Sequence, residues 1–210
     1  GKIASEVREM VRKKDWIGKT VYEICEEVEG EIKKRGAKCA FPVNTSINEI
    51  AAHYTAEPND PITIKDTDLV KIDLGAQVNG YIADTAVTVC YDAQYDGLVQ
   101  TAEEALANAM SMIKSGVKAS DIGRTIESTI KQKGFKPIAN LSGHSLDQYT
   151  IHAGRSIPNI WSIGGFSLSE NSAYACEPFV TTEKGGGFVR NGQIKNIFAI
   201  NSRKKTKNEE

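Results

Sequence analysis

The stretch 71–84 constrains the fold most strongly, because it predicts two apolar β-strands that each carry one acid. Asn79-Gly80 lies between the two strands. This dipeptide suits a type I′ hairpin turn, in which both central residues need positive φ. Side chains alternate along a strand, so the hairpin would place Asp73 and Asp84 on one face as diagonal neighbours.

The register set by this turn pairs Asp73 with Ala86 and Asp84 with Gly75. Two carboxylates so close repel one another and resist joint ionisation, and a cation between them removes that conflict. A simpler interpretation is two solvent-facing acids on an edge hairpin. The hairpin alone does not decide between these interpretations.

Composition places the chain among ordinary globular proteins. Its 210 residues suffice for one large domain or two small ones, and 40% are hydrophobic and 25% charged. The formal net charge is -1, so neither nucleic acid nor a membrane is indicated as a general partner. No apolar run reaches the length of a membrane span, and no signal peptide is recognised. The cysteines lie far apart without a CxxC pair, which is typical of reduced core cysteines in a cytosolic protein: Cys25, Cys39, Cys90 and Cys176.

Helical periodicity is clearest in the first two thirds of the chain. It predicts helices over 1–14, from Thr20 to Gly36, over 93–114 and from Ser120 to Gly134. An extended run is expected at 39–43, followed by a turn at 44–46. The apolar face of the helix over 93–114 is expected to pack in the core: Leu98, Ala102, Ala105, Leu106, Ala109, Met110 and Ile113.

From Phe135 onward, short β-like runs alternate with glycine turns. Together with the first half, they predict a mixed α/β fold of the α+β type, in one domain over residues 1–200 without an internal linker. The tail 201–210 is polar and is expected to be disordered. The expected short strands are 143–145, 149–152, 157–161, 173–180 and 194–200.

Four further polar residues interrupt apolar β-like context: His53, His144, His152 and Glu177. The chain has only three histidines, and all three occur in this way. A single buried histidine or glutamate is usually a satisfied core group. Ionised acids are rarely buried unpaired, so six such residues, counting Asp73 and Asp84, together favour a functional site over separate core positions.

These residue types indicate metal chemistry. Several carboxylates with an imidazole suit divalent Mn, Fe, Co or Zn. More than two carboxylates in one site suggest two ions, which in hydrolytic enzymes activate water and stabilise an oxyanion. A structural zinc site lacks the required cysteine spacing, and a Cys–His or Ser–His nucleophile has no local motif here.

Several segments in register resemble the type 2 methionine aminopeptidases, and the archaeal branch looks most similar. The resemblance runs from about residue 1 to 200. Its segments are Phe41-Pro42-Val43-Asn44-Thr45-Ser46-Ile47-Asn48-Glu49-Ile50-Ala51-Ala52-His53-Tyr54-Thr55, Lys71-Ile72-Asp73-Leu74-Gly75, Ile82-Ala83-Asp84, Asn140-Leu141-Ser142-Gly143-His144-Ser145, Ile151-His152-Ala153-Gly154 and Glu177-Pro178-Phe179.

The resemblance implies the pita-bread fold, in which two antiparallel half-sheets covered by helices enclose two divalent metal ions. It implies that Asp73, Asp84, His144 and Glu177 are metal ligands and that Glu177 also handles the proton of the water. It further implies that His53 and His152 bind the scissile amide as catalytic and substrate-binding residues. Phe41 and Ile151 match positions that line the pocket for the methionine side chain.

The activity implied by the resemblance is removal of the initiator methionine from nascent polypeptides whose second residue is small. Such an enzyme would act in the cytoplasm, where the ribosome is a candidate partner. Members of the family are usually monomeric. No membrane and no specific nucleic acid are expected as partners.

One departure from the family concerns a fifth ligand, a second bridging glutamate in an apolar strand near the C-terminus. The carboxylates after Glu177 lack that context: Glu183, Glu209 and Glu210. The sequence therefore predicts a domain incomplete at both ends, cut at the family's helical insertion, with an incomplete second half-sheet. A chain with four of five ligands is expected to hold two ions only weakly by itself.

Three alternatives stay open at this point. The chain could be a catalytically impaired pita-bread module that binds protein or RNA, or it could be one half of a split enzyme. It could also be a proline-specific peptidase of the same fold. The segments around Phe41 and His53 resemble the methionine enzymes more than the proline-specific ones.

Overall fold

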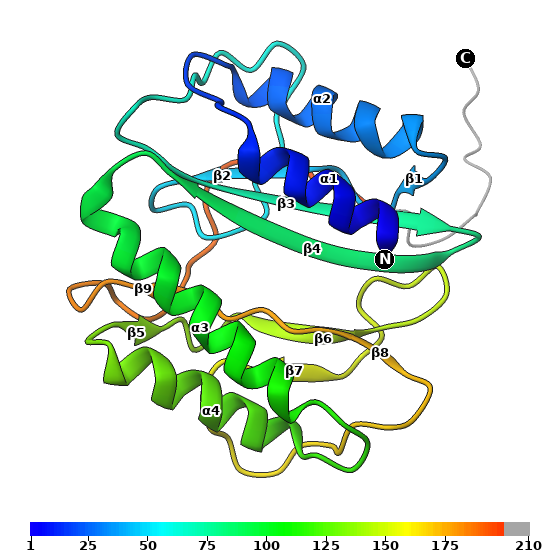
Figure 1. The fold of residues 1–210 in the computed structure, drawn as a ribbon, viewed down its shortest axis with the longest axis vertical. Helices are drawn as coiled ribbons and strands as arrows, with labels where there is room; N and C mark the ends of the chain where they lie inside the picture. The colour runs from blue at the N-terminus through cyan, green and yellow to red at the C-terminus, as the bar shows by residue number, and fades with distance from the viewer. Residues whose placement is uncertain (200–210) are drawn as a thin grey trace.

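The computed structural model describes residues 1–199 and places two α/β halves against one another (Figure 1). The helices lie on the outside, and strands of the two halves face each other. Ile200 and the predicted polar tail 201–210 lie outside the described residues. The helices are α1 (Lys2–Lys13), α2 (Val21–Lys34), η1 (Ala93–Tyr95), α3 (Asp96–Met112) and α4 (Ala119–Gln132). The strands are β1 (Lys38–Cys39), β2 (Asn44–Ile47), β3 (Leu69–Val78), β4 (Tyr81–Cys90), β5 (Lys136–Pro137), β6 (Ser142–Leu146), β7 (Ser156–Pro158), β8 (Ala173–Ala175) and β9 (Val180–Thr181).

The predicted hairpin forms the centre of the first half. Strands β3 and β4 pair antiparallel over their full length, and the turn residues Asn79 and Gly80 have φ of 53° and 83°. Both values are those a type I′ turn requires, so the prediction from Asn-Gly is confirmed. On its other edge, β3 pairs with β1 and β2.

The segment 44–46, predicted as a turn, is instead part of β2. Asn44, Thr45 and Ser46 pair with Asp73, Ile72 and Lys71 and are buried. Three polar residues in succession are typical of turns, but the ladder to β3 satisfies their backbone groups. Tertiary pairing therefore overrides local preference here.

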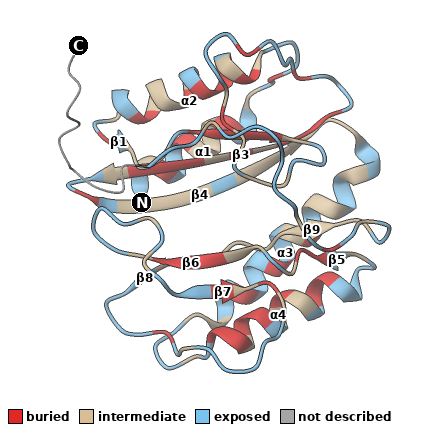
Figure 2. Cartoon of the chain, turned by 180° about the vertical axis from the view of Figure 1, so that it is seen from behind, coloured by how far each residue is buried: buried red, intermediate tan, exposed pale blue. Residues whose placement is uncertain are grey.

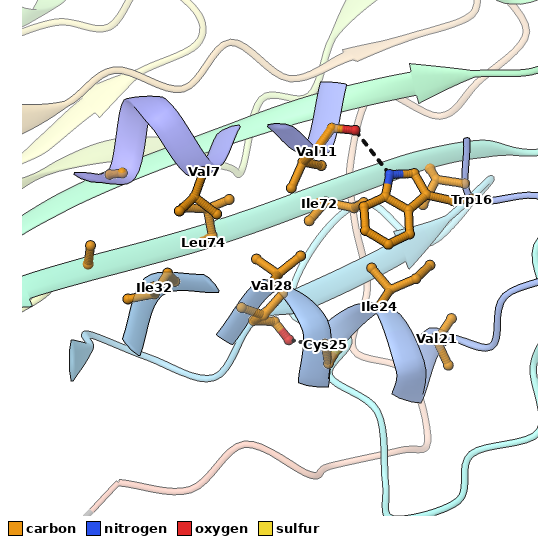
Figure 3. Packing of buried hydrophobic residues seen from close by; sticks show 14 of the residues in the cluster. Val7, Val11, Trp16, Val21, Ile24, Cys25, Val28, Ile32, Ile72 and Leu74 are labelled. Carbon is orange, nitrogen blue, oxygen red and sulfur yellow. Dashed lines mark hydrogen bonds between the residues drawn. The ribbon is translucent and has the colours of Figure 1, made fainter. Parts of the chain in front are cut away.

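Helices α1 and α2 cover the outer face of the first sheet, where apolar side chains alternate along β3. Thr20 and Glu23 form a capping box that begins α2. The indole Nε1 of Trp16 donates to the carbonyl of Val11 at 3.0 Å (Figure 3). The cluster also contains, among others, Val7, Ile24, Val28, Ile32, Ile72 and Leu74, all fully buried (Figure 3).

The second half has much shorter strands, which form two small sheets. Strand β6 pairs with β7 and β8, and β5 pairs with β9. The expected strands at 149–152 and 194–199 do not form. Tyr149 adopts a φ of 58° inside a turn, which ends the first of these runs. Figure 2 shows that the connecting loops of this half are largely exposed.

The prediction for the face of α3 is wrong in part. Ala105 and Ala109 are buried, but Leu106 is 37% and Met110 53% exposed. Helix α3 packs mainly against α4, so the buried residues of α3 lie on the face toward α4. The remaining apolar side chains of α3 border an open cavity instead of filling a core.

The two halves meet at the tip of the hairpin. The backbone amide of Tyr149 donates to the carbonyl of Gly80 at 2.9 Å, and Nε2 of Gln148 donates to the carbonyl of Asn79 at 2.8 Å. Within residues 1–199, no helix is long and apolar enough to cross a membrane.

Candidate metal centre

Asp73 and Asp84 reach the site from the two strands of the hairpin. The register pairs Asp73 with Ala86 and Asp84 with Gly75, as predicted. Burial raises the pKa of Asp73 well above its ordinary value, and the charges of Asp84 and Glu177 raise it further. The protein thus holds several acids in a place where, without a cation, they cannot all ionise easily.

His144 reaches the site from β6, on the facing sheet. Its neighbour Gly143 allows β6 to approach β8 closely, because a Cβ on Gly143 would lie 2.2 Å from the carbonyl oxygen of Ala175. Pairing of His144 with Ala175 then places Glu177, two residues further on, beside the imidazole. A glycine here is a packing requirement of the site.

Three of the predicted ligands form a compact group. One ligand atom from each of Asp84, His144 and Glu177 lies within 4.8 Å of the others. Nε2 of His144 is 3.4 Å from Oδ2 of Asp84 and 3.1 Å from Oε1 of Glu177. Burial lowers the pKa of His144, but the nearby carboxylates of Asp84 and Glu177 outweigh burial and raise it to about 10. The fourth predicted ligand, Asp73, lies outside this group but borders the same cavity.

This donor set fits a divalent cation. Oε1 of Glu177 is fully buried and lacks a hydrogen-bond partner among the described residues, although Nε2 of His144 is nearby. A buried acceptor without a donor is costly, and a metal ion would satisfy it. Two carboxylates and one imidazole are the ligand types that Mn, Fe, Co and Zn accept.

The other two histidines lie at the edge of this group. The rings of His144 and His152 are 4.4 Å apart in an edge-on arrangement. Burial lowers the pKa of His152, and the charges of His144 and His53 lower it further. His53 is exposed, has a φ of 63° and borders the cavity. An imidazole N–H can donate a hydrogen bond to an amide oxygen, so these positions suit substrate contact.

The two predicted pocket residues have different surroundings. Phe41 lies over Gly75, where a Cβ would be only 2.3 Å from the phenyl ring, so it lies beside the position that pairs with Asp84. Ile151 is half-buried next to His152. As far as the described residues go, neither side chain contributes to the lining of the large cavity.

A cavity of about 1240 Å³ opens beside the acids. It is bordered on one side by the inner faces of β3 and β4 and on another by the exposed apolar side chains of α3. The segment 174–182 closes a third side. The acids therefore lie at the wall of a space large enough for a peptide.

Sequence reasoning missed the other polar residues on the inner face of β2 and β3. Asn44, Ser46 and Lys71 share that face with Asp73, since directly paired residues point to the same side. The sequence signal that could have revealed them is the alternation of polar and apolar residues through Lys71 and Asp73. It was overlooked because 44–46 was interpreted as a turn.

Residues 1–200 match the sequence profile described as metallopeptidase family M24. The chain belongs to this family. Members of family M24 with curated names include "Methionine aminopeptidase" of Pyrococcus abyssi, 49% identical over 186 residues, and that of Methanocaldococcus jannaschii, 44% identical over 198 residues. The matches cover 88% and 94% of this chain and 63% and 67% of those relatives. The chain thus spans under two thirds of the Pyrococcus protein.

Solved M24 structures show the same fold. The methionine aminopeptidase of Thermotoga maritima has a TM-score of 0.78 at 30% identity and covers 85% of this chain and 76% of that one. The prolidase of Pyrococcus furiosus has a TM-score of 0.74 at 25% identity and covers 87% and 54%. The expected pita-bread architecture is thereby confirmed, and the fold alone does not separate the two substrate classes.

Proposed function

We propose that the chain carries the catalytic machinery of a methionine aminopeptidase of type 2. The observation that carries this proposal is the compact group of Asp84, His144 and Glu177 beside Asp73, in a chain 44–49% identical to proteins with that name. The reaction would remove an N-terminal methionine that precedes a small residue.

In this proposal each site residue has at least one of three roles: metal binding, contact with the scissile amide, or contact with the methionine side chain. Asp73, Asp84, His144 and Glu177 would hold two divalent ions, Co, Mn, Fe or Zn. Bound ions would lower the pKa of a water and offset negative charge on the amide oxygen. His53 and His152 would donate hydrogen bonds to the scissile amide, and Glu177 would move the proton of the water. Phe41 and Ile151 would contact the methionine side chain.

The setting proposed for this activity is the cytoplasm, with nascent chains at the ribosome as substrates. The four cysteines are unpaired, which suits a reducing compartment. We also propose a monomer, without a membrane or a specific nucleic acid as partner, and size-exclusion chromatography with light scattering tests the oligomeric state.

Peptide turnover tests the function directly. The purified chain is assayed with Mn²⁺ or Co²⁺ on the peptide Met-Ala-Ser and on the dipeptide Met-Pro. We expect release of methionine from the first, and a loss of at least about a thousandfold in Asp84→Asn. Asp66→Asn, at an exposed turn, is the matched control and should keep full activity. Cleavage of Met-Pro alone would assign the chain to the proline-specific class.

A second candidate is a module of impaired activity, or one part of a split enzyme. One observation favours considering it, namely the exposed apolar side of α3. Within residues 178–199 the one acid is Glu183, which is exposed and is not part of the group of acids, so we propose that the described residues supply four ligands to the site. Calorimetric titration with Mn²⁺ should then show fewer than two tight sites. Two tight sites with turnover like that of a full-length enzyme would contradict this.

A further inference from the structure

The loop that carries His53 has few restraints of its own. Ala51, Ala52 and His53 form no hydrogen bond with any other described residue. His53 has a φ of 63°, a conformation that is unfavourable for a residue with a Cβ. Such a conformation persists only where the surrounding structure enforces it. The position of this imidazole must therefore be set by the two ends of its loop.

The C-terminal end of the loop is tied to β2. The backbone amide of Thr45 donates to the carbonyl of Tyr54 at 2.7 Å, and the hydroxyl of Thr55 donates to the carbonyl of Val43 at 2.8 Å. The phenol of Tyr54 donates to Asp60 at 2.6 Å. These bonds begin directly after His53.

The N-terminal end depends on Asn48. Its backbone amide donates to the carbonyl of Leu69 and its Oδ1 accepts from the amide of Leu69, both at 2.9 Å. Its Nδ2 donates to Oδ1 of Asp68, also at 2.9 Å. With a φ of 50°, it adopts a conformation that asparagine tolerates better than most residues.

The remaining polar group of Asn48 is its carbonyl oxygen, and Nζ of Lys71 donates to it at 2.8 Å. Hydrogen bonds from a charged donor are roughly twice as strong as neutral ones. Lys71 stands two residues before Asp73 on the inner face of β3. One strand therefore carries both a predicted metal ligand and the residue that fixes the start of the His53 loop.

We propose that Lys71 and Asn48 are positioning residues for His53. Lys71 fixes the carbonyl of Asn48, Asn48 fixes the start of the loop, and the loop presents the imidazole toward the cavity at a constant place relative to Asp73. This inference rests on the proposed function for its consequence in catalysis, but the positioning itself is a property of the fold.

The test uses two variants that each remove a different restraint at the N-terminal end of the loop. Lys71→Met removes the donor and its charge, whereas Asn48→Gly removes the side-chain bonds, retains the positive φ and leaves the charge unchanged. We expect kcat/KM for Met-Ala-Ser to fall about tenfold or more in each, because small displacements of a positioned group are costly. Lys71→Arg should recover part of the loss, and Lys65→Met, at an exposed position, should change nothing.

The double variant separates positioning from charge. If both residues act through one loop, the loss in the double variant is clearly smaller than the product of the single losses. A loss equal to that product, or a loss in Lys71→Met with none in Asn48→Gly, would show that Lys71 acts on the acids by its charge. Either result would overturn the proposal.

NMR provides a measurement that does not depend on activity. The chain has three histidines, so the Cε1–H signals can be assigned with His53→Gln. In the folded variants, as judged by dispersed spectra, we expect the His53 signal to shift or broaden more than that of His144. An unchanged His53 signal in both variants would contradict the proposal, even if the chain cleaves no peptide and the proposed function fails.

Discussion

The two halves of the molecule bring ligands to one site by different means. In the first half, β3 and β4 pair over ten residues each, and the register alone places Asp73 and Asp84. In the second half, β6 has five residues and β8 three. There, close backbone approach at Gly143 and bonds between loops place His144 and Glu177. A long ladder and a set of short strands thus bring ligands to the same site, and substitutions in the two halves should have different effects.

The largest effect is expected in the core of the first half. Ile72 is fully buried between the sheet and the helices, and Ile72→Ala should lower the free energy of unfolding by about 4 kcal/mol. Ile126→Ala should cost about 2–3 kcal/mol, because Ile126 packs in the smaller cluster of the second half. Urea denaturation measures both, with exposed Val78→Ala as control. Equal losses of unfolding free energy in Ile72→Ala and Ile126→Ala would contradict the expected difference between the two cores.

A smaller effect separates two glycines that each lie beside a ligand strand. A Cβ on Gly143 would meet backbone atoms of Ala175 and Cys176, whereas a Cβ on Gly75 would meet two side chains, the ring of Phe41 and the Cβ of Ala40. Gly143→Ala should lower stability by about 2–3 kcal/mol and weaken Mn²⁺ binding. Gly75→Ala should mainly raise KM for methionine peptides. Thermal unfolding, calorimetry and steady-state kinetics distinguish these outcomes, and the reverse pattern would contradict the assignment of Phe41.

A pH-dependent contribution is expected from Glu127, which joins α4 to the loop at Trp161. Burial raises its pKa, but the bonds from Lys131 and from the backbone amide of Trp161 outweigh burial and lower it. A lowered pKa in the folded state adds stability above the unfolded value, near 4.5, and this stability is lost as the pH falls through the folded value.

Glu127→Gln should therefore be less stable than the parent chain at pH 7, by about 1 kcal/mol. The difference should vanish as the pH falls through the lowered pKa of the folded state, because the parent residue is then protonated too. Glu26→Gln, exposed on α2, is the control in the first half. A difference that persists in acid would show that packing, and not charge, explains the loss.

The smallest effect is expected on the open side of α3. Leu106 and Met110 are partly exposed, so Leu106→Ser should change the free energy of unfolding by no more than about 0.5 kcal/mol. Ala105→Asn, at the neighbouring buried position, should be severely destabilising. Chemical denaturation of the two variants compares these faces. A large loss in Leu106→Ser would mean that this side is covered in solution.

Particular residues show how far the sequence could predict this structure. The Asn-Gly turn was enough to predict the shared face of Asp73 and Asp84, because a two-residue period leaves no other choice. Residues 44–46 could not be recognised as a strand, since their partner lies 25 to 29 residues away by register and their own preference is for turns. The face of α3 was misjudged because periodicity reports an apolar stripe but not what lies opposite it.

The candidate site was predicted by a different route. The approach of His144 and Glu177 to Asp84 came from resemblance, and no local pattern contained it. The close contact at Gly143 that permits it depends on β8, some thirty residues further along the chain. The roles of the ligands, of His53 and His152, and of Phe41 and Ile151 stay predictions.

The turn at Asn79 and Gly80 also affects how the two halves of the site move relative to one another. It fixes the register of the hairpin, and it also contacts Gln148 and Tyr149 of the other half. Gly80 has no room for a side chain, because a Cβ would lie 2.5 Å from the ring of Tyr149. A displacement of this turn would therefore shift the carboxylates of Asp73 and Asp84 together with the imidazole of His144. The movements of these ligands are then correlated. The distance between ligands of opposite halves should then vary less than the position of either half.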